Sequence, residues 1–175
     1  MTFKLGEILW RQFGASIDML INVISMCPDN YLATNKRFYY LAYHAALFLD
    51  YYLTIPPQDF SPMLSFTIQD HNRPEESIGD MIPDKIYSKR ELIHYLNASR
   101  LKSRHLMERL TESDIVNMRF TEGNQKDDMD YPVLEILLYN MRHTQHHIGQ
   151  LNLMIRQDLD THMDWAFRVD ELPTV

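Results

Sequence analysis

Apolar residues recur every three to five positions over four long stretches of this chain, and this pattern limits the fold more than any other feature. A spacing near 3.6 residues places apolar side chains on one face of an α-helix, whereas strands alternate at every second residue. Each stretch is about twenty residues long, which exceeds an ordinary strand. We therefore predict four amphipathic helices, the first beginning near Phe3, over residues 3–26, 35–53, 88–110 and 130–157.

Prolines and capping residues indicate where these helices begin and end. Pro28 ends the first helix because proline cannot donate to the helical hydrogen-bond ladder. Ser88 and Glu91 have the spacing of a capping box, which predicts the start of the third helix. In the fourth helix we expect Asp130 to cap the N-terminus and Pro132 to occupy the first turn, where its missing N–H has no cost.

The segments between the helices complete the predicted architecture. The connection over residues 54–87 is unusually long for a compact domain and is expected to form a functional loop or lid. A short helical turn is predicted near residues 113–116, and the C-terminal tail is expected to dock through Trp165 and Phe167. The chain, residues 1–175, is thus predicted to be one all-α domain, a four-helix bundle with the long connection between its second and third helices. A helical-repeat array is the alternative, but no internal period supports it.

Composition and charge exclude several classes of function. The chain has 5 glycines among 175 residues, which disfavours hairpins, and a formal net charge of −7. This acidic balance, without a cluster of lysines and arginines, argues against binding to nucleic acid or to an anionic membrane surface. No apolar run approaches the roughly 20 residues of a membrane span. The single cysteine, Cys27, cannot form an internal disulfide, and this favours a cytoplasmic location.

Histidines gather in the predicted fourth helix at a spacing that suits metal binding. His143 and His147 are four residues apart, so their imidazoles stack on one helical face within the apolar stripe. His44 lies in the inward stripe of the second helix and would supply a third imidazole. Three histidine ligands leave a position for water or substrate, as in catalytic metal sites. The alternative is that the same histidines are packed, metal-free and hydrogen-bonded to protein groups.

The remaining histidines fit other roles. His146 points toward the flank of the fourth helix, and His71 lies on the long connection, where it could approach the mouth of the bundle. Three more are expected to be solvated among polar residues: His94, His105 and His162.

The stretch "HTQHHIGQL" resembles the motif of the DinB-like (damage-inducible) metal-binding proteins. In that superfamily an H-x-x-x-H pair on the fourth helix runs into a Gly-Gln-hydrophobic sequence, and a separate histidine lies on the second helix. The matching residues here are His143, His147, the Gly149–Leu151 run and His44. The resemblance implies an up-down-down-up four-helix bundle, often homodimeric, with a three-histidine divalent metal site. This chain departs from the family at Ile148, where arginine is common.

The better understood members of the superfamily are thiol-dependent transferases, which suggests the first of three hypotheses. His44, His143 and His147 would hold Zn²⁺, Ni²⁺, Fe²⁺ or Mn²⁺, and the metal would activate a low-molecular-weight thiol, or water, for attack on a small electrophilic substrate. Asn140, one turn before His143, could orient the bound group. The second hypothesis is a bundle that binds a metal or small ligand without turnover. The third is a structural or partner-binding dimer without metal.

Overall fold

The computed structural model describes residues 5–69 and 71–172, and most of these residues are helical. The long helices of this part of the chain are α1 (Leu5–Met26), α3 (Lys36–Tyr51), α4 (Lys89–Arg109) and α6 (Val133–Leu159). Two short helices, α2 (Asp29–Thr34) and α5 (Glu112–Asn117), lie in the connections. The helical periodicity of the sequence therefore predicted the long elements correctly, while the expected start of the first helix at Phe3 lies outside the described residues.

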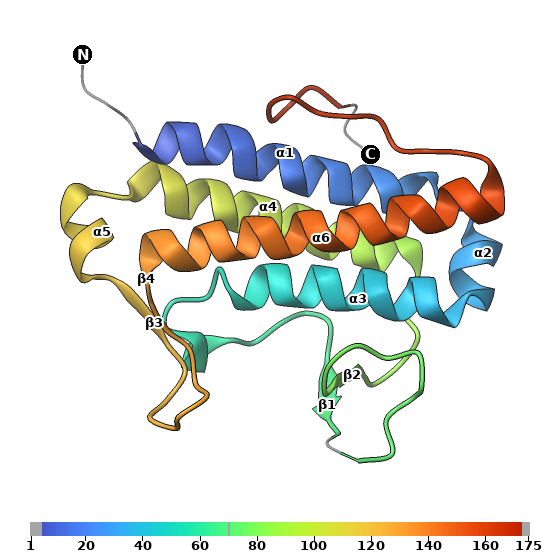
Figure 1. The fold of residues 1–175 in the computed structure, drawn as a ribbon, viewed down its shortest axis with the longest axis horizontal. Coiled ribbons are helices and arrows are strands. Elements are labelled where there is room, and N and C mark those ends of the chain that lie inside the picture. Colours follow the sequence, from blue (N-terminus) through green and yellow to red (C-terminus); the bar gives the residue numbers. More distant parts are fainter. Residues whose placement is uncertain (1–4, 70, 173–175) are drawn as a thin grey trace.

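The long helices pack side by side around a shared apolar core (Figure 1). Helix α1 contacts α4 and α6, and α3 contacts α6 and α4. Helices α1 and α6 run in one direction, from left to right in Figure 1, and α3 and α4 run in the other. The core is built from fully buried side chains of all four, among them Phe13, Ile17, Leu20, Phe38, Leu47, Leu92, Leu96, Ile148 and Leu151. Each such side chain contributes about 1.5–3 kcal/mol on burial.

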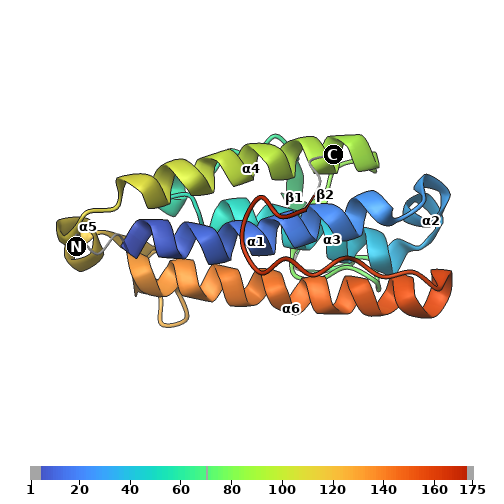
Figure 2. The same ribbon diagram turned by 90° about the horizontal axis from the view of Figure 1, so that it is seen from above.

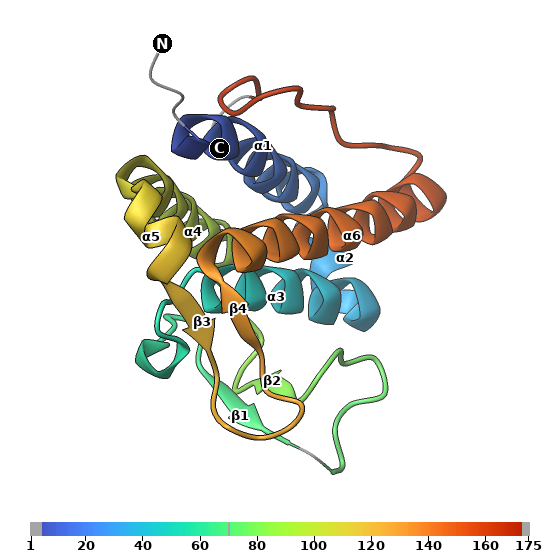
Figure 3. The ribbon, with the colours of Figure 1, turned by 60° about the vertical axis from the view of Figure 1, so that its left-hand side comes forward.

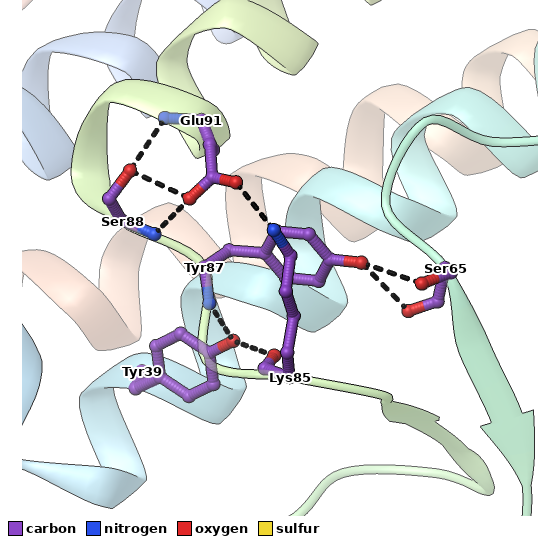
Figure 4. Close-up of polar contacts among 6 residues, drawn as sticks. All are labelled: Tyr39, Ser65, Lys85, Tyr87, Ser88 and Glu91. Carbon is purple, nitrogen blue, oxygen red and sulfur yellow. Dashed lines mark hydrogen bonds and ion pairs between the residues drawn. The ribbon is translucent and has the colours of Figure 1, made fainter.

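The capping box predicted at the start of α4 is present (Figure 4). The backbone N–H of Glu91 donates to the Ser88 hydroxyl at 3.3 Å, and the Glu91 carboxylate accepts from the backbone N–H of Ser88 at 2.8 Å. Lys85 adds an ion pair to the same carboxylate at 2.8 Å. This exchange satisfies backbone donors that a helix start leaves without partners, so it fixes where α4 begins.

Short strands, which the sequence analysis did not predict, lie within the connections as two antiparallel pairs in the described residues. Strand β1 (Phe66–Ile68) pairs with β2 (Met81–Pro83), and β3 (Arg119–Thr121) pairs with β4 (Asp130–Pro132). Figure 3 shows both hairpins extending from the same side of the helices, beyond α3. A single-turn helix, η1 (Pro57–Asp59), precedes β1.

The predicted start of the fourth helix at Asp130 is wrong. Asp130 and Pro132 belong to β4, and α6 begins at Val133. The Asp130 carboxylate accepts hydrogen bonds from Arg119 and from the Thr121 hydroxyl, both at 2.8 Å. Because these partners belong to the neighbouring strand, the carboxylate serves the hairpin and does not cap the helix.

Two tyrosines of α3, Tyr39 and Tyr43, hold the long connection against the helices, and Figure 4 shows the contacts of Tyr39. The Tyr39 hydroxyl accepts from the backbone N–H of Tyr87 at 3.0 Å and donates to the Lys85 carbonyl at 3.2 Å. The Tyr43 hydroxyl donates to the Ser65 carbonyl at 3.2 Å, and the Tyr87 hydroxyl lies 2.8 Å from that of Ser65. Both ends of the segment between β1 and α4 are therefore anchored to α3.

The C-terminal tail does not dock through Trp165 and Phe167 as predicted. These side chains are 63% and 75% exposed, whereas Ala166 between them is buried. Figure 2 shows the tail returning across α1, where the backbone N–H of Val169 donates to the Arg11 carbonyl at 3.0 Å. The small Ala166 belongs to the core cluster, so the tail packs through this residue and the two aromatic side chains face solvent.

None of the helices in the described ranges, 5–69 and 71–172, is long and apolar enough to cross a membrane.

Candidate metal centre

The metal-ligating residues suggested by the sequence come from the middle of two neighbouring helices. His44 lies on α3, and His143 and His147 lie one turn apart on α6. Since α3 and α6 pack along each other, the three imidazoles come close together between these two helices. His44 is 9% exposed and His147 is 6% exposed, while His143 is half-buried.

The three imidazoles converge on one point. The Nε2 atom of His143 lies 3.0 Å from Nε2 of His147 and 3.3 Å from Nε2 of His44. One ligand nitrogen from each ring lies within 4.8 Å of the others. Two nitrogens that each bind one zinc ion at ~2.0–2.1 Å with tetrahedral geometry are about 3.3 Å apart. The two separations from Nε2 of His143 are therefore close to those of nitrogen ligands around a common ion, and the third pair of ligand nitrogens lies within 4.8 Å.

Carbonyl oxygens on the far side of two rings determine which nitrogen carries the hydrogen. Nδ1 of His44 lies 3.1 Å from the Ile78 carbonyl, and Nδ1 of His147 lies 2.8 Å from Oε1 of Gln150. A carbonyl oxygen can only accept, so each Nδ1 is the donor and each Nε2 carries a free lone pair. Histidine ligands of metal sites have this arrangement, with the second ring nitrogen donating to an acceptor.

His143 cannot satisfy both of its neighbours in the absence of a cation. A neutral imidazole has one N–H, so its Nε2 can donate to either His44 or His147, but not to both. Among the described residues, Nδ1 of His143 is itself a buried side-chain nitrogen without a hydrogen-bond partner. A divalent ion at the common point would accept all three lone pairs, so the donor set fits a metal better than it fits a closed hydrogen-bond network.

Burial keeps these imidazoles in the neutral form that binds metal. It lowers the pKa of His44 to about 3, with further lowering from His147 and His143. It lowers the pKa of His143 to about 4, and the neighbouring His147 and His146 act in the same direction. The pKa of His147 is also lowered by burial, against the opposing effect of its hydrogen bond to Gln150. Metal binding at neutral pH would therefore require no prior loss of protons.

Aromatic side chains form the wall of the site toward the C-terminal end of α3. The Phe48 ring lies 4.4 Å from that of His44 and 6.0 Å from that of His143, measured between centroids. Tyr52 meets His143 edge-on at 5.6 Å, and Tyr139 stacks on it at 6.2 Å. These rings restrict the rotation of the imidazoles and exclude water from this side.

The other residues that the sequence analysis considered lie in different environments. Asn140 is fully buried, and its amide donates to the Leu49 carbonyl at 2.9 Å, while its oxygen accepts from the Thr144 hydroxyl at 3.4 Å. It thereby joins α6 to α3 one turn before His143, and its suggested role toward a bound group stays a prediction. His146 is exposed, with its ring 5.1 Å from that of His147. The remaining histidines are exposed: His71, His94, His105 and His162.

The sequence analysis assigned no role to two groups that accept hydrogen bonds from the ligand imidazoles. The Ile78 carbonyl is a backbone group on the long connection, and no pattern of residue types indicates its position. Gln150 follows His147 by three residues and so lies on the same face of the helix, a spacing that could have identified it as a partner for the ring.

Comparisons with known proteins give a partial family match, which agrees with the resemblance seen in the sequence. The model of the DinB family matches residues 80–160. The matched region contains His143, His147 and Gln150, and His44 lies outside it, so the third histidine is supported by its place in the apolar stripe and by the geometry of the site. Neither the curated proteins nor the solved structures include a match to this chain.

Proposed function

We propose that this protein is a divalent-metal-dependent enzyme, most simply a thiol-dependent transferase, and the match of the DinB family model to residues 80–160 supports this proposal. His44, His143 and His147 are the metal ligands in this proposal, and the ion is Zn²⁺, Ni²⁺, Fe²⁺ or Mn²⁺. The substrates are a low-molecular-weight thiol and a small electrophile. Hydrolysis, with water in place of the thiol, is a variant of the same chemistry.

One observation carries the proposal. Three imidazoles, two buried and one half-buried, bring their Nε2 atoms together, with that of His143 3.0 and 3.3 Å from the other two, while the Nδ1 hydrogens of His44 and His147 are already donated to carbonyl oxygens. With these Nδ1 hydrogens used, the nitrogen lone pairs at the centre of the three neutral rings outnumber the N–H hydrogens that could be donated to them. A cation at the centre would accept the unmatched lone pairs, and three protein ligands leave a position for a reacting group.

The chemistry of such a centre needs a thiol from outside the chain. A divalent ion held by three imidazoles lowers the pKa of a thiol or water in its remaining position, which gives a nucleophile at neutral pH. The chain's own Cys27 does not fit this role, because it is fully buried in the core at the end of α1 and burial raises its pKa to about 11.

The surrounding residues would position the reactants and limit access of water. Phe48, Tyr52 and Tyr139 close one side of the triad, so a substrate would approach from the outer face of α3 and α6. Asn140 ties these two helices together beside His143, which keeps the ligands of the two helices at a constant separation.

The proposal extends to the architecture. We assign the long helices to the up-down-down-up four-helix bundle of the superfamily, as one domain, and this assignment is supported by the opposite courses of α1 and α6 against α3 and α4. The homodimer and the cytoplasmic location predicted for such proteins remain part of the proposal.

A turnover assay tests the enzymatic part. Zinc-, nickel-, iron- and manganese-loaded protein would be mixed with a panel of low-molecular-weight thiols and a chromogenic aryl halide, and release of halide would be followed. We expect metal-dependent turnover that His147→Ala abolishes and that His105→Ala, an exposed histidine on α4, leaves unchanged. Stoichiometric metal without turnover over the whole panel would favour a non-catalytic metal- or ligand-binding protein.

A further inference from the structure

Two carbonyl oxygens outside the triad hold the ligand imidazoles in place. The Ile78 carbonyl accepts from Nδ1 of His44 at 3.1 Å, and Oε1 of Gln150 accepts from Nδ1 of His147 at 2.8 Å. We propose that Gln150 and the Ile78 carbonyl are positioning groups of the metal centre, and that Ile78 makes residues 74–80 of the long connection part of that centre. This inference rests on the proposed metal site and adds to it the groups that set the ligands' orientation.

Gln150 acts on His147 from the same helix. Its three-residue separation brings its side chain over the preceding turn, where the amide oxygen meets Nδ1. This contact fixes the tautomer with a free lone pair on Nε2 and stops the ring from turning over. Loss of such a partner in metal sites costs 10–100-fold in metal affinity, and an anionic partner makes the ligand more basic.

Ile78 acts on His44 from a separate segment. The next residue, Gly79, has a φ of +74°, a conformation that side chains other than glycine rarely adopt. Its Cα lies against the ring, since an added Cβ would be 3.7 Å from both Cε1 and Nδ1 of His44. Arg73 holds the following peptide by donating to the Gly79 carbonyl at 3.1 Å. The carbonyl that orients His44 is thus set by a specific backbone conformation.

The same two groups border a groove on the outer face of the molecule. A pocket of about 760 Å³ lies between α3, α6 and the connection, and its lining includes Ile78 and Gln150 together with Arg37 and Glu76. The wall of this pocket and the far side of the triad are therefore built from the same residues. Metal binding that immobilises His44 would also immobilise this wall through Ile78.

Metal affinity tests the role of Gln150. Zinc would be titrated into metal-free full-length protein against a chromogenic chelator, for wild type, Gln150→Leu, Gln150→Glu and the control Gln125→Leu, an exposed glutamine in the loop between β3 and β4. We expect Gln150→Leu to bind 10–100-fold more weakly, Gln150→Glu to bind at least as tightly as wild type, and Gln125→Leu to be unchanged. Wild-type affinity in Gln150→Leu, with its metal-free melting temperature unchanged, would overturn the assignment.

Hydrogen exchange tests the role of Ile78. Amide exchange over residues 74–80 should slow severalfold when one equivalent of zinc is added, while exchange in α5, which lies away from the site, stays the same. Gly79→Val should weaken zinc binding, and Gly79→Asn should weaken it less because asparagine tolerates positive φ. Stoichiometric zinc binding without a change over residues 74–80 would refute this inference and leave the metal site standing. A wild-type protein that binds no zinc would instead refute the proposed function.

Discussion

Replacing His147 by alanine should remove the stabilisation that a divalent ion gives to this fold. The imidazole is 6% exposed and its Nε2 lies 3.0 Å from that of His143, so the variant keeps two of the three ligands. An ion that binds only the folded state stabilises it by about 2.7 kcal/mol at a concentration 100 times its Kd. At ~2–4 °C per kcal/mol for a chain of this size, zinc should raise the wild-type Tm by roughly 5–11 °C. The shift for His147→Ala should be under about 2 °C, because two ligands bind the ion far more weakly.

Differential scanning calorimetry of chelator-treated protein, with and without zinc, measures both shifts. Gly149→Ala is the matched control, since Gly149 is an exposed residue of α6 and an added Cβ would meet nothing within 4 Å. This control should gain about 0.8–1 kcal/mol without metal, because alanine favours a helix over glycine, and it should keep the full zinc shift. Equal zinc shifts in wild type and His147→Ala would refute the assignment of three ligands.

Three further predictions concern packing and reactivity. Gly6→Ala should lower the free energy of unfolding in urea by about 1–3 kcal/mol, because its Cβ would lie 2.0 Å from the Met107 carbonyl oxygen; a stabilised variant would contradict this close approach of α1 to α4. The pKa of Cys27 is raised from 9.0 to about 11, so at pH 8 this residue should be present as thiolate about a hundredfold less than a free thiol. Its alkylation by iodoacetamide should therefore become faster as the pH rises toward 11. Rapid alkylation of the folded protein at pH 8 would count against the burial of Cys27. Trp165→Ser or Phe167→Ser should change the free energy of unfolding by less than about 0.5 kcal/mol in the same urea assay, because both rings are exposed. A loss above about 1 kcal/mol would show that these rings pack against the protein in solution.

The long helices could be predicted because their signals are local. Apolar spacing reports which face of a helix is buried, and the capping box of Ser88 and Glu91 uses only residues within one turn. The start of α6 was misplaced because Asp130 fits two roles equally well by residue type. Its partners, Arg119 and Thr121, lie on a strand of three residues, too short to show any alternation.

In the candidate site, too, the residues with a local sequence signal were predicted and those that depend on tertiary structure were not. His143 and His147 were recognisable from their four-residue spacing, and His44 from its place in the stripe of α3. The hydrogen bond that orients the His44 ring depends on tertiary structure, since a backbone carbonyl such as that of Ile78 has no signature in the sequence. The side of the tail that faces α1 was likewise not predictable, because it depends on hydrogen bonds between residues far apart in the sequence, such as those from the backbone N–H groups of Val169 to the Arg11 carbonyl and of Asp170 to the Asp18 carboxylate.

X-ray absorption at the metal edge gives the most direct test of the central claim. Protein isolated without a nickel column and loaded with one equivalent of zinc should show three imidazole nitrogens at ~2.0–2.1 Å and one further light ligand. His44→Ala should reduce the imidazole count to two or lose the ion altogether. A wild-type spectrum with fewer than three imidazoles, or one that His44→Ala leaves unchanged, would contradict a metal centre shared between α3 and α6.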